Sequence, residues 1–533
     1  MALVQQKGLQ DSFYLMRTAL ATSLLMLLSM PGRFGWWPLL FVALVPLMTF
    51  VMRKGPRLSF VAGMVTGSFY HAGMLYWIVI VLGRYGGLPL ALSVPAMLLL
   101  SLFMGLYTAL FAGLLSYFLA GKNAGGRVSV RILFAAPVLW VGLDWLRGVL
   151  FSGFPWMDLG YGLAFQPIFL QIADLGGHHL ITFALVLTNG LVLVAVNQFR
   201  HGNSGKAVRK VRMTVSLAVL FLLFAGGYSV FRYQQFSRAS EMSPKLQVAV
   251  VQGNIPQDEK WTSTRKKSTL DIYHRLAEEA VSKNDATLVV WPETALPFFP
   301  SNDPLFSTVT SWAAGRGLWL LTGAPYFVLN TDLERPFNKA VSYFNSALLV
   351  NPSGKVVGRY DKQHLVPFGE YVPLRKQFPF LEPLVESVGN FSFGSSSVPL
   401  STGTFKLGVL ICYESIFPNL ARQEVDAGAN VLVNITNDAW YGRSSAPYQS
   451  FSMSILRAVE TRRSLVRAAN TGISAFVDPV GRVMEESPIF ESLSLSAAVP
   501  IMEEKTIFTR FGYLFAPVCL FLFVFMFVVW RRK

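Results

Sequence analysis

Three motifs in this sequence place a carboxylate, an amine and a thiol where strand-like segments end. Glu293 follows the apolar run Leu288–Trp291, and Cys412 follows the run Leu407–Ile411. Lys362 lies between them in chain order, within the motif Tyr-Asp-Lys-Gln-His. Because α/β folds gather their active groups at the carboxyl ends of strands, we expect the three side chains to converge on one site.

The chemistry of the three groups is complementary. A cysteine thiol has a free pKa of about 8.5, so it needs a base or a nearby positive charge to become an attacking thiolate. Glu293 could take the proton, while Lys362 stabilises first the thiolate and then a tetrahedral oxyanion. A fixed donor in that role contributes roughly 3 kcal/mol or more, and the backbone N–H of Tyr413 is the natural second donor. A thiolate and a carboxylate repel each other, so Lys362 must lie between or beside them.

Each of these residues also has a structural interpretation. A lone cysteine after an apolar strand is usually a small buried hydrophobic residue. Glu293 could be a turn carboxylate and Lys362 a solvated charge, and we interpret His364 as structural rather than as a base. The occurrence of all three motifs together favours catalysis.

The composition indicates a membrane protein. Hydrophobic residues make up 53% of the 533 residues and charged residues only 14%, against about a quarter in soluble chains. A bilayer-spanning helix takes about 20 apolar residues. The predicted spans are Ser12–Met30, Trp37–Met52, Leu58–Leu82, Leu88–Ala120, Ile132–Phe151, Ile168–Val196, Met213–Phe231 and Phe511–Trp530.

The positive residues support this reading. Lys and Arg gather before the first span, in alternate loops and at the C-terminus, which by the positive-inside rule predicts that both termini are cytoplasmic. The first span lacks a small-x-small cleavage site, so we interpret it as an uncleaved helix. The net charge of +16 therefore reflects topology, and we expect no nucleic-acid partner.

Residues 234–505 differ from the rest, with short β-type runs among helical stretches and frequent Pro, Gly, Asn and Asp. This alternation predicts a layered α/β or α+β domain, on the non-cytoplasmic side because it follows the seventh span. The predicted strands are Leu246–Val251, Thr287–Trp291, Trp319–Thr322, Ala347–Val350, Leu407–Cys412, Val431–Ile435 and Ser474–Val477, and the predicted helices include Leu270–Ser282 and Tyr448–Arg462. Only two cysteines are present, Cys412 and Cys519, and the histidines show no ligand spacing, so we expect no metal and no disulfide.

The order Glu293, Lys362, Cys412 resembles the Glu–Lys–Cys triad of the nitrilase superfamily. Together with Val-Gln-Gly-Asn-Ile-Pro followed by Lys260 and Trp261, Trp-Pro-Glu at Glu293 and Asn-Asp-Ala-Trp-Tyr-Gly around Trp440, the motifs resemble those of the bacterial apolipoprotein N-acyltransferase family. The resemblance implies eight transmembrane helices, seven in residues 1–233 and one in residues 506–533, and a periplasmic nitrilase-like αββα domain over residues 234–505.

The resemblance also implies a reaction and a location. Members of that family, in the bacterial inner membrane, transfer an acyl chain from a phospholipid, chiefly phosphatidylethanolamine, to the α-amino group of a diacylglyceryl-cysteine at the N-terminus of an apolipoprotein. Cys412 would carry a thioester in a ping-pong cycle with Glu293 as base, without a cofactor. Residues that match further family positions are expected to support the site or contact substrate: Trp261, Glu370, Tyr413, Glu414 and Trp440.

Several alternatives remain open. The same triad would serve a membrane-tethered amidohydrolase with water as acceptor, and a transporter or scaffold would lack the chemistry altogether. The apolar segment Tyr371–Phe393 is interpreted as a mobile arm on the lipid surface. In the helical half, Asp144 and Arg147 are predicted to form an interfacial ion pair, and the stretch containing Asp174, His178 and His179 is interpreted as a loop at the membrane face rather than a proton relay.

Overall fold

The computed structural model divides the chain into two compact units. One comprises residues 1–83, 88–232 and 513–533, and the other residues 84–87 and 233–512. The structure describes residues 2–32, 34–120, 130–201, 206–258, 260, 263–329, 341–372, 391–395 and 398–531.

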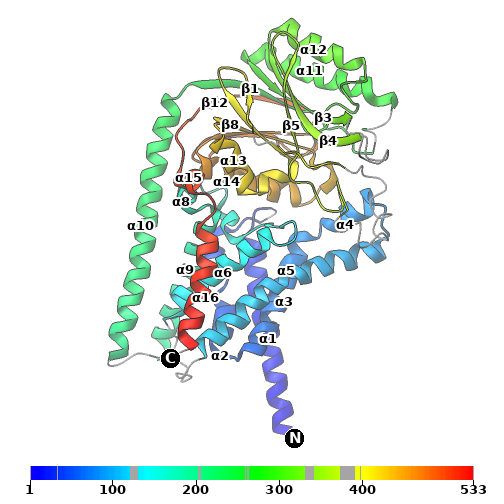
Figure 1. The fold of residues 1–533 in the computed structure, drawn as a ribbon. Coiled ribbons are helices and arrows are strands. Elements are labelled where there is room, and N and C mark those ends of the chain that lie inside the picture. The colour runs from blue at the N-terminus through cyan, green and yellow to red at the C-terminus, as the bar shows by residue number, and fades with distance from the viewer. Residues whose placement is uncertain are drawn as a thin grey trace, which may run out of the picture. The chain divides into compact units, whose positions relative to one another are not determined.

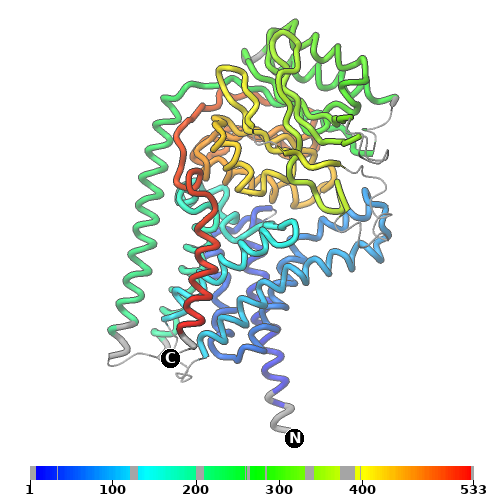
Figure 2. Tube along the Cα trace, in the orientation of Figure 1, coloured from blue at the N-terminus to red at the C-terminus, as the bar shows by residue number. Residues whose placement is uncertain are grey.

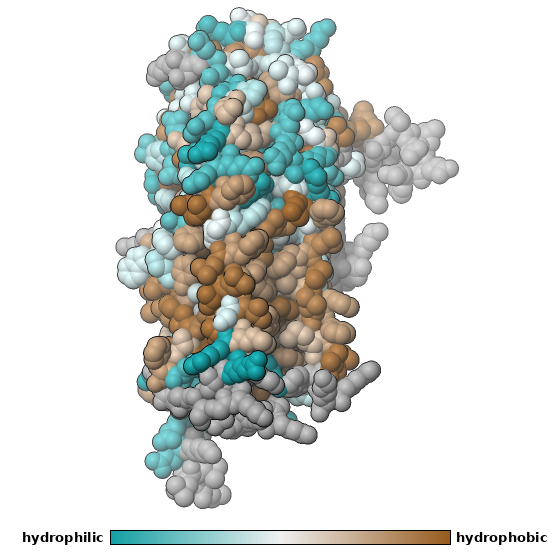
Figure 3. All heavy atoms as spheres, turned by 90° about the vertical axis from the view of Figure 1, so that its left-hand side faces the viewer, coloured by the Kyte–Doolittle hydropathy of each residue, from teal (hydrophilic) through white to brown (hydrophobic). Residues whose placement is uncertain are grey.

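The first unit is built from helices (Figure 1). Its elements are α1 (Ala2–Ser29), η1 (Trp37–Phe41), α2 (Val45–Arg53), α3 (Pro56–Leu75), α4 (Ile78–Ile80), η2 (Val81–Tyr85), α5 (Leu90–Leu119), α6 (Ile132–Val149), η3 (Leu159–Leu163), α7 (Pro167–Leu170), α8 (Ala173–Gly176), α9 (His178–His201), α10 (Lys206–Met242, which continues into the second unit) and α16 (Phe515–Arg531). The beginning of α1 and the end of α16 lie toward the same side of this unit (Figure 2). Apolar side chains cover much of the face of this unit that Figure 3 shows, as expected of a membrane-bound protein.

Within the described residues, five helices are long and apolar enough to cross a membrane. They lie in α1, α5, α6, α9 and α10, and a sixth span results if α3 and the following Ile78–Tyr85 are one helix bent by 55°. The predicted spans at Trp37–Met52 and Phe511–Trp530 correspond to shorter apolar helices, Trp37–Arg53 and Phe515–Val529. The number eight therefore stays a prediction.

One predicted span is wrong as a continuous helix. The segment predicted at Ile168–Val196 consists of the short helices α7 and α8 followed by α9, which begins at His178. The break falls at Gly177, whose φ of 68° lies in the left-handed region that glycine tolerates. The span was predicted from hydropathy, which does not detect this break because a glycine does not interrupt an apolar run.

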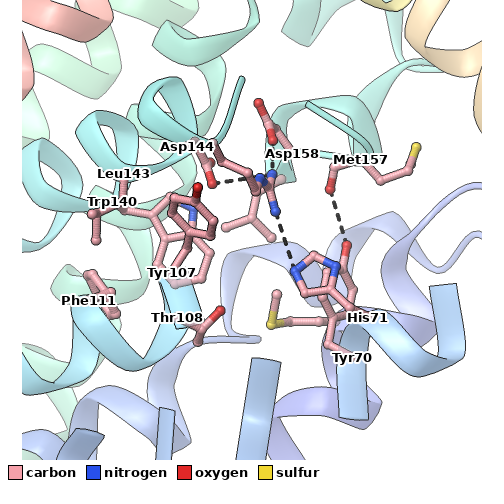
Figure 4. Close-up of a pocket in the computed structure, with 13 residues that line it drawn as sticks. Tyr70, His71, Tyr107, Thr108, Phe111, Trp140, Leu143, Asp144, Met157 and Asp158 are labelled. Atoms are coloured by element: carbon pink, nitrogen blue, oxygen red, sulfur yellow. Dashed lines mark hydrogen bonds and ion pairs between the residues drawn. The ribbon is translucent and has the colours of Figure 1, made fainter. Parts of the chain in front are cut away.

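A buried ionic cluster joins four segments of the helical unit (Figure 4). Arg147 on α6 contacts the carboxylate of Asp158, lies 3.5 Å from Asp144 and donates to Nε2 of His71 on α3 at 3.4 Å. Asp158 also accepts a 2.8 Å bond from Nε2 of His178, at the start of α9. The predicted Asp144–Arg147 pair is therefore present, and it is buried, with side chains 9% and 5% exposed. Its position near the membrane surface stays a prediction.

The other polar stretch of the helical half does not form a single relay. Asp174 accepts hydrogen bonds from the hydroxyl of Tyr228 and from Nε of Arg232, each at 2.9 Å, which ties α8 to α10. The rings of His178 and His179 instead lie against Asp158. The segment is built of the short helix α8 and the start of α9, which the sequence interpretation had assigned to a loop.

The second unit is a four-layered α/β sandwich with two six-stranded sheets. The strand orders are β12-β1-β2-β3-β4-β5 and β11-β10-β9-β8-β7-β6. The first sheet contains β1 (Lys245–Gln252), β2 (Leu288–Val290), β3 (Trp319–Leu329), β4 (Val341–Val350), β5 (Val356–Asp361) and β12 (Leu493–Pro500). The second contains β6 (Leu400–Ser401), β7 (Lys406–Ile411), β8 (Val431–Thr436), β9 (Ser464–Ala469), β10 (Ala475–Val477) and β11 (Val483–Glu486).

Helices cover the outer faces of both sheets (Figure 1). Helices α11 (Lys266–Asn284) and α12 (Leu305–Arg316) pack on the first sheet, and α13 (Pro418–Asp426) and α14 (Ala446–Thr461) on the second, while α15 (Ile507–Phe511) follows the last strand. Inward-facing residues of the two sheets, such as Val250, Leu321, Val409 and Val433, form one buried core. This αββα layering is the predicted nitrilase-like architecture.

The predicted strands all coincide with observed ones, but the sheets contain more. Strand β3 continues to Leu329 through Gly323 and Pro325, and β4 begins at Val341 rather than Ala347. Strand β5 is the strand-like segment expected before Lys362, whereas β6, β9, β11 and β12 were not predicted. Strand β9 is fully buried although it contains Arg467, which obscures its apolar pattern.

Candidate active site

Strand ends bring the three predicted residues together. Glu293 lies on the turn after β2, Lys362 follows β5 in the same sheet, and Cys412 follows β7 in the facing sheet. The backbone is in the left-handed region at Cys412 (φ 54°) and at Thr294 (φ 47°), where non-glycine residues are uncommon. At both positions the chain turns sharply where a strand ends, and residues with such backbone angles are common in active sites.

Lys362 lies between two carboxylates. Its Nζ is 2.9 Å from Oε2 of Glu370 and 3.6 Å from Oε1 of Glu293, and its side chain is 1% exposed. Burial alone would lower the pKa of Lys362, but the charges of Glu370 and Glu293 raise it well above its ordinary value. Lys362 therefore remains an ammonium group throughout the physiological pH range, as its predicted role requires.

An asparagine that was not predicted holds both carboxylates. The side-chain amide of Asn345, on β4, donates to Oε1 of Glu293 at 2.7 Å and to Oε1 of Glu370 at 2.9 Å. The backbone N–H of Asn437, after β8, donates to Oε2 of Glu293 at 2.8 Å. With both its oxygens bonded, Glu293 is fixed in orientation.

Glu414 organises the chain around Lys362 and Cys412. Its carboxylate accepts hydrogen bonds from the backbone N–H groups of Ile411, Gln363 and His364 and from the hydroxyl of Tyr360, at 2.6–3.0 Å. Burial raises its pKa to about 7, against the stabilising effect of these donors. This predicted supporting residue thus connects the nucleophile turn to the lysine loop.

Cys412 is a thiol at rest. Burial and, secondarily, the charge of Glu293 raise its pKa to about 12, although Lys362 acts in the opposite direction. The side chain is nevertheless partly exposed. A base must therefore remove the proton before the sulfur attacks, and Glu293 is close enough for its charge to act on the thiol.

The remaining predicted residues differ in how far the structure describes them. Tyr413 is buried in the turn Cys412–Ile416, and Trp440 lies on the turn Asp438–Tyr441, its ring 5.3 Å from that of Tyr85. His364 packs its ring 3.9 Å from Phe417, which agrees with a structural role. Trp261 and residues 373–390, which form most of the predicted arm, lie outside the described residues.

A group that could hold a metal ion lies elsewhere. In the described part of the chain, ligand atoms of Asp158, His178 and His179 lie within 4.8 Å of one another, in the helical unit. Asp158 is also paired with the guanidinium of Arg147.

Sequence reasoning missed two further residues of the site. Asn345 is an amide inside a buried strand, and Lys260 is a lysine without any exposed surface. A polar side chain at an inward-facing strand position was the available signal for Asn345. Lys260 stands beside Trp261 in a motif that supports the family resemblance, but the sequence assigns it no role in the site.

Comparison with known proteins agrees with the fold of the second unit. Residues 247–502 match the family model described as carbon-nitrogen hydrolase, and residues 22–191 match that of the apolipoprotein N-acyltransferase N-terminal domain. An amidase from Nesterenkonia sp. is a structural neighbour with a TM-score of 0.35 and 22% identity, covering 49% of this chain and 92% of the amidase. The family match over residues 247–502 identifies the second unit as a carbon–nitrogen hydrolase domain.

Full-length relatives make the assignment more specific. The apolipoprotein N-acyltransferase of Geobacter metallireducens is 40% identical over 95% of this chain and 93% of its own length. That of Haemophilus ducreyi is 32% identical over 87% and 86%. The chain belongs to the apolipoprotein N-acyltransferase family, and it is a membrane-bound acyltransferase.

Proposed function

We propose that the protein moves a fatty acyl chain from a phospholipid to the free α-amino group of the diacylglyceryl-cysteine at the N-terminus of an apolipoprotein, through a thioester on Cys412. The observation that carries the proposal is the convergence of an ordered carboxylate, a permanent ammonium and a thiol at the strand ends of the α/β unit. Phosphatidylethanolamine is the proposed donor.

In the first half-reaction, Glu293 takes the proton of Cys412 and the thiolate attacks the ester carbonyl of the phospholipid. Lys362, together with the backbone N–H of Tyr413, stabilises the oxyanion of the tetrahedral intermediate. The intermediate collapses with loss of the lysophospholipid alkoxide, which receives the proton held by Glu293. The products are a thioester on Cys412 and a lysophospholipid.

In the second half-reaction, the neutral amine of the apolipoprotein attacks the thioester. Glu293 accepts a proton from the attacking nitrogen, and the second tetrahedral intermediate expels the thiolate of Cys412. Glu293 then returns its proton to the sulfur. An amide has formed, and the enzyme is restored to its starting state.

The membrane setting suits these substrates. Both carry at least two acyl chains and do not leave the bilayer at useful rates, so the enzyme must work at the membrane face. We propose eight spans, seven in residues 1–233 and one in 506–533, in the inner membrane with both termini cytoplasmic. Residues 234–505 would then be the periplasmic catalytic domain.

Trp261, Trp440 and Glu370 are proposed to support this chemistry. Glu370 holds Lys362, and the two tryptophans would contact substrate. The Tyr371–Phe393 segment remains the proposed arm over the lipid surface.

Mass spectrometry of the purified full-length protein tests the proposal. After incubation with phosphatidylethanolamine, we expect a fatty acyl adduct on Cys412 that a lipopeptide with a free N-terminal amine removes, while an N-acetylated lipopeptide does not. The Cys412→Ala variant should form no adduct and should unfold at the same temperature as the wild type. An adduct lost equally fast without any amine would instead support a hydrolase, and no adduct at all would exclude both.

A further inference from the structure

Lys260 is a buried lysine beside the proposed base. Its side chain has no exposed surface, and its Nζ donates to the backbone carbonyl of Glu293 at 3.1 Å and to the hydroxyl of Thr294 at 2.7 Å. Among the residues that the structure describes, no carboxylate is recorded within ion-pair distance of this ammonium. A buried lysine without a direct counter-ion is rare and costly.

The backbone that Lys260 contacts is already tightly constrained. Thr294 has a φ of 47°, and a Cβ at Gly323 would approach the backbone of Pro292, Glu293 and Thr294 to within 2.5–2.7 Å. The turn that carries Glu293 is therefore packed against Gly323 and hydrogen-bonded to Lys260. Its main-chain position depends on both contacts.

The charges of the site show why an ammonium is useful here. Glu293 and Glu370 share the amide of Asn345, so two carboxylates lie close together in a buried site. Lys362 supplies one positive charge between them. With Lys362 alone the three groups carry one excess negative charge, and an uncompensated charge in a buried site is costly.

The other charged groups that face the site are already compensated. Asp438 pairs with Arg467 at 2.9 Å, and the charge of Glu414 is held by three backbone N–H donors. The Lys260 ammonium therefore brings Glu293, Glu370 and Lys362 to electrical neutrality. Transfer of the Cys412 proton to Glu293 leaves this sum unchanged.

We infer that Lys260 is a positioning residue for the base: it fixes the main chain at Glu293 and supplies the second positive charge that balances the carboxylates of Glu293 and Glu370. The inference rests on the proposed function, because it concerns the base of that reaction. Burial lowers the pKa of Lys260 to about 8, partly offset by the charge of Glu293, so the ammonium form is present at neutral pH and below.

The pH dependence of acylation distinguishes this role from a purely structural one. The rate of adduct formation on Cys412 is measured in a single turnover with phosphatidylethanolamine in detergent micelles between pH 5 and 8. In Lys260→Met, the acid limb of the profile should move to higher pH by about one unit, with a small change in the phospholipid concentration for half-maximal rate. Lys260→Arg retains the positive charge and should keep the wild-type limb, even if its maximal rate is lower.

Controls separate the possible failures. Lys266→Met removes a lysine on the same stretch of chain that pairs with Asp303 at 2.9 Å on the surface, and its profile should match the wild type. If Lys260→Met does not fold, Lys260→Gln, which keeps a donor without the charge, provides the same comparison. An acid limb at the wild-type pH in a folded neutral variant would overturn the inference, whereas absence of any adduct in the wild type would overturn the proposed function itself.

Discussion

Asn345 offers the sharpest test of the site, because one nitrogen donates both its hydrogens to the two carboxylates. Replacing it with leucine preserves approximate size and removes the 2.7 Å bond to Glu293 and the 2.9 Å bond to Glu370. A hydrogen bond to a charged group contributes about 1.5–3 kcal/mol. The two together are therefore worth roughly 3–6 kcal/mol in a buried site.

Only part of this energy affects the barrier, because Asn437 and Lys362 still hold the carboxylates. We expect Asn345→Leu to raise the activation free energy by about 3 kcal/mol, which makes acylation of Cys412 roughly 100-fold slower. Single-turnover mass spectrometry of the thioester adduct measures the rate directly. The affinity for phospholipid should change little.

Asn351→Ala is the matched control for Asn345→Leu. Asn351 follows the far end of the same strand, and its Oδ1 accepts hydrogen bonds from the N–H groups of Ser353 and Lys355 at a surface turn. This variant should lose about 1 kcal/mol of stability and keep the wild-type acylation rate. An acylation rate for folded Asn345→Leu within threefold of the wild type would refute the reasoning.

Three further changes test other parts of the molecule. Burial, and then the charge of Glu414, raises the pKa of Glu424 from 4.5 to about 8. The stabilising contribution of Glu424 is therefore complete below pH 4.5 and falls as the pH rises toward 8. Glu424→Gln should raise the unfolding temperature at pH 8 and leave it unchanged at pH 4. Arg147→Met should cost about 3–5 kcal/mol of stability because it leaves buried carboxylates without a counter-ion, and adding Asp158→Asn should restore part of the loss in thermal unfolding. Gly323→Ala places a methyl group within 2.5–2.7 Å of the Glu293 turn, and overpacking of this kind costs about 1–3 kcal/mol. Adduct formation should therefore slow by at least about fivefold, and a wild-type rate would show that this turn tolerates displacement.

The fold was predictable where the sequence pattern is local. Short β-branched runs such as Val431–Ile435 identify buried strands, and the αββα layering followed from the family resemblance. Strand β9 could not be predicted from its pattern, because its charged Arg467 is buried by pairing with Asp438 and Asn434. Such a pairing depends on residues about 30 positions away, which no local periodicity contains.

The candidate site shows the same limit. Glu293, Lys362 and Cys412 each sit in a motif with distinctive neighbours, so they could be found from the sequence. Asn345 acts through a contact across 52 sequence positions to Glu293. Lys260 belongs to a motif, but its contact with the backbone of Glu293, 33 positions away, appears only in the folded chain. Residues that position a catalytic group are hidden from the sequence when their partners come from other strands.

The raised pKa of Cys412 protects the thiol from side reactions such as alkylation and oxidation. Because burial and Glu293 raise the thiol pKa to about 12, almost no thiolate exists at neutral pH in the resting site. The sulfur becomes nucleophilic only as Glu293 removes its proton, and the developing negative charge needs both Lys362 and an acceptor carbonyl in place. A cysteine kept in this form resists alkylation and oxidation between turnovers, unlike a thiol activated by a lowered pKa. We therefore expect iodoacetamide to modify the free wild-type enzyme at pH 7 far more slowly than a small peptide thiol of ordinary pKa, which peptide mass spectrometry at Cys412 would measure; faster modification would mean that the site stabilises a resting thiolate.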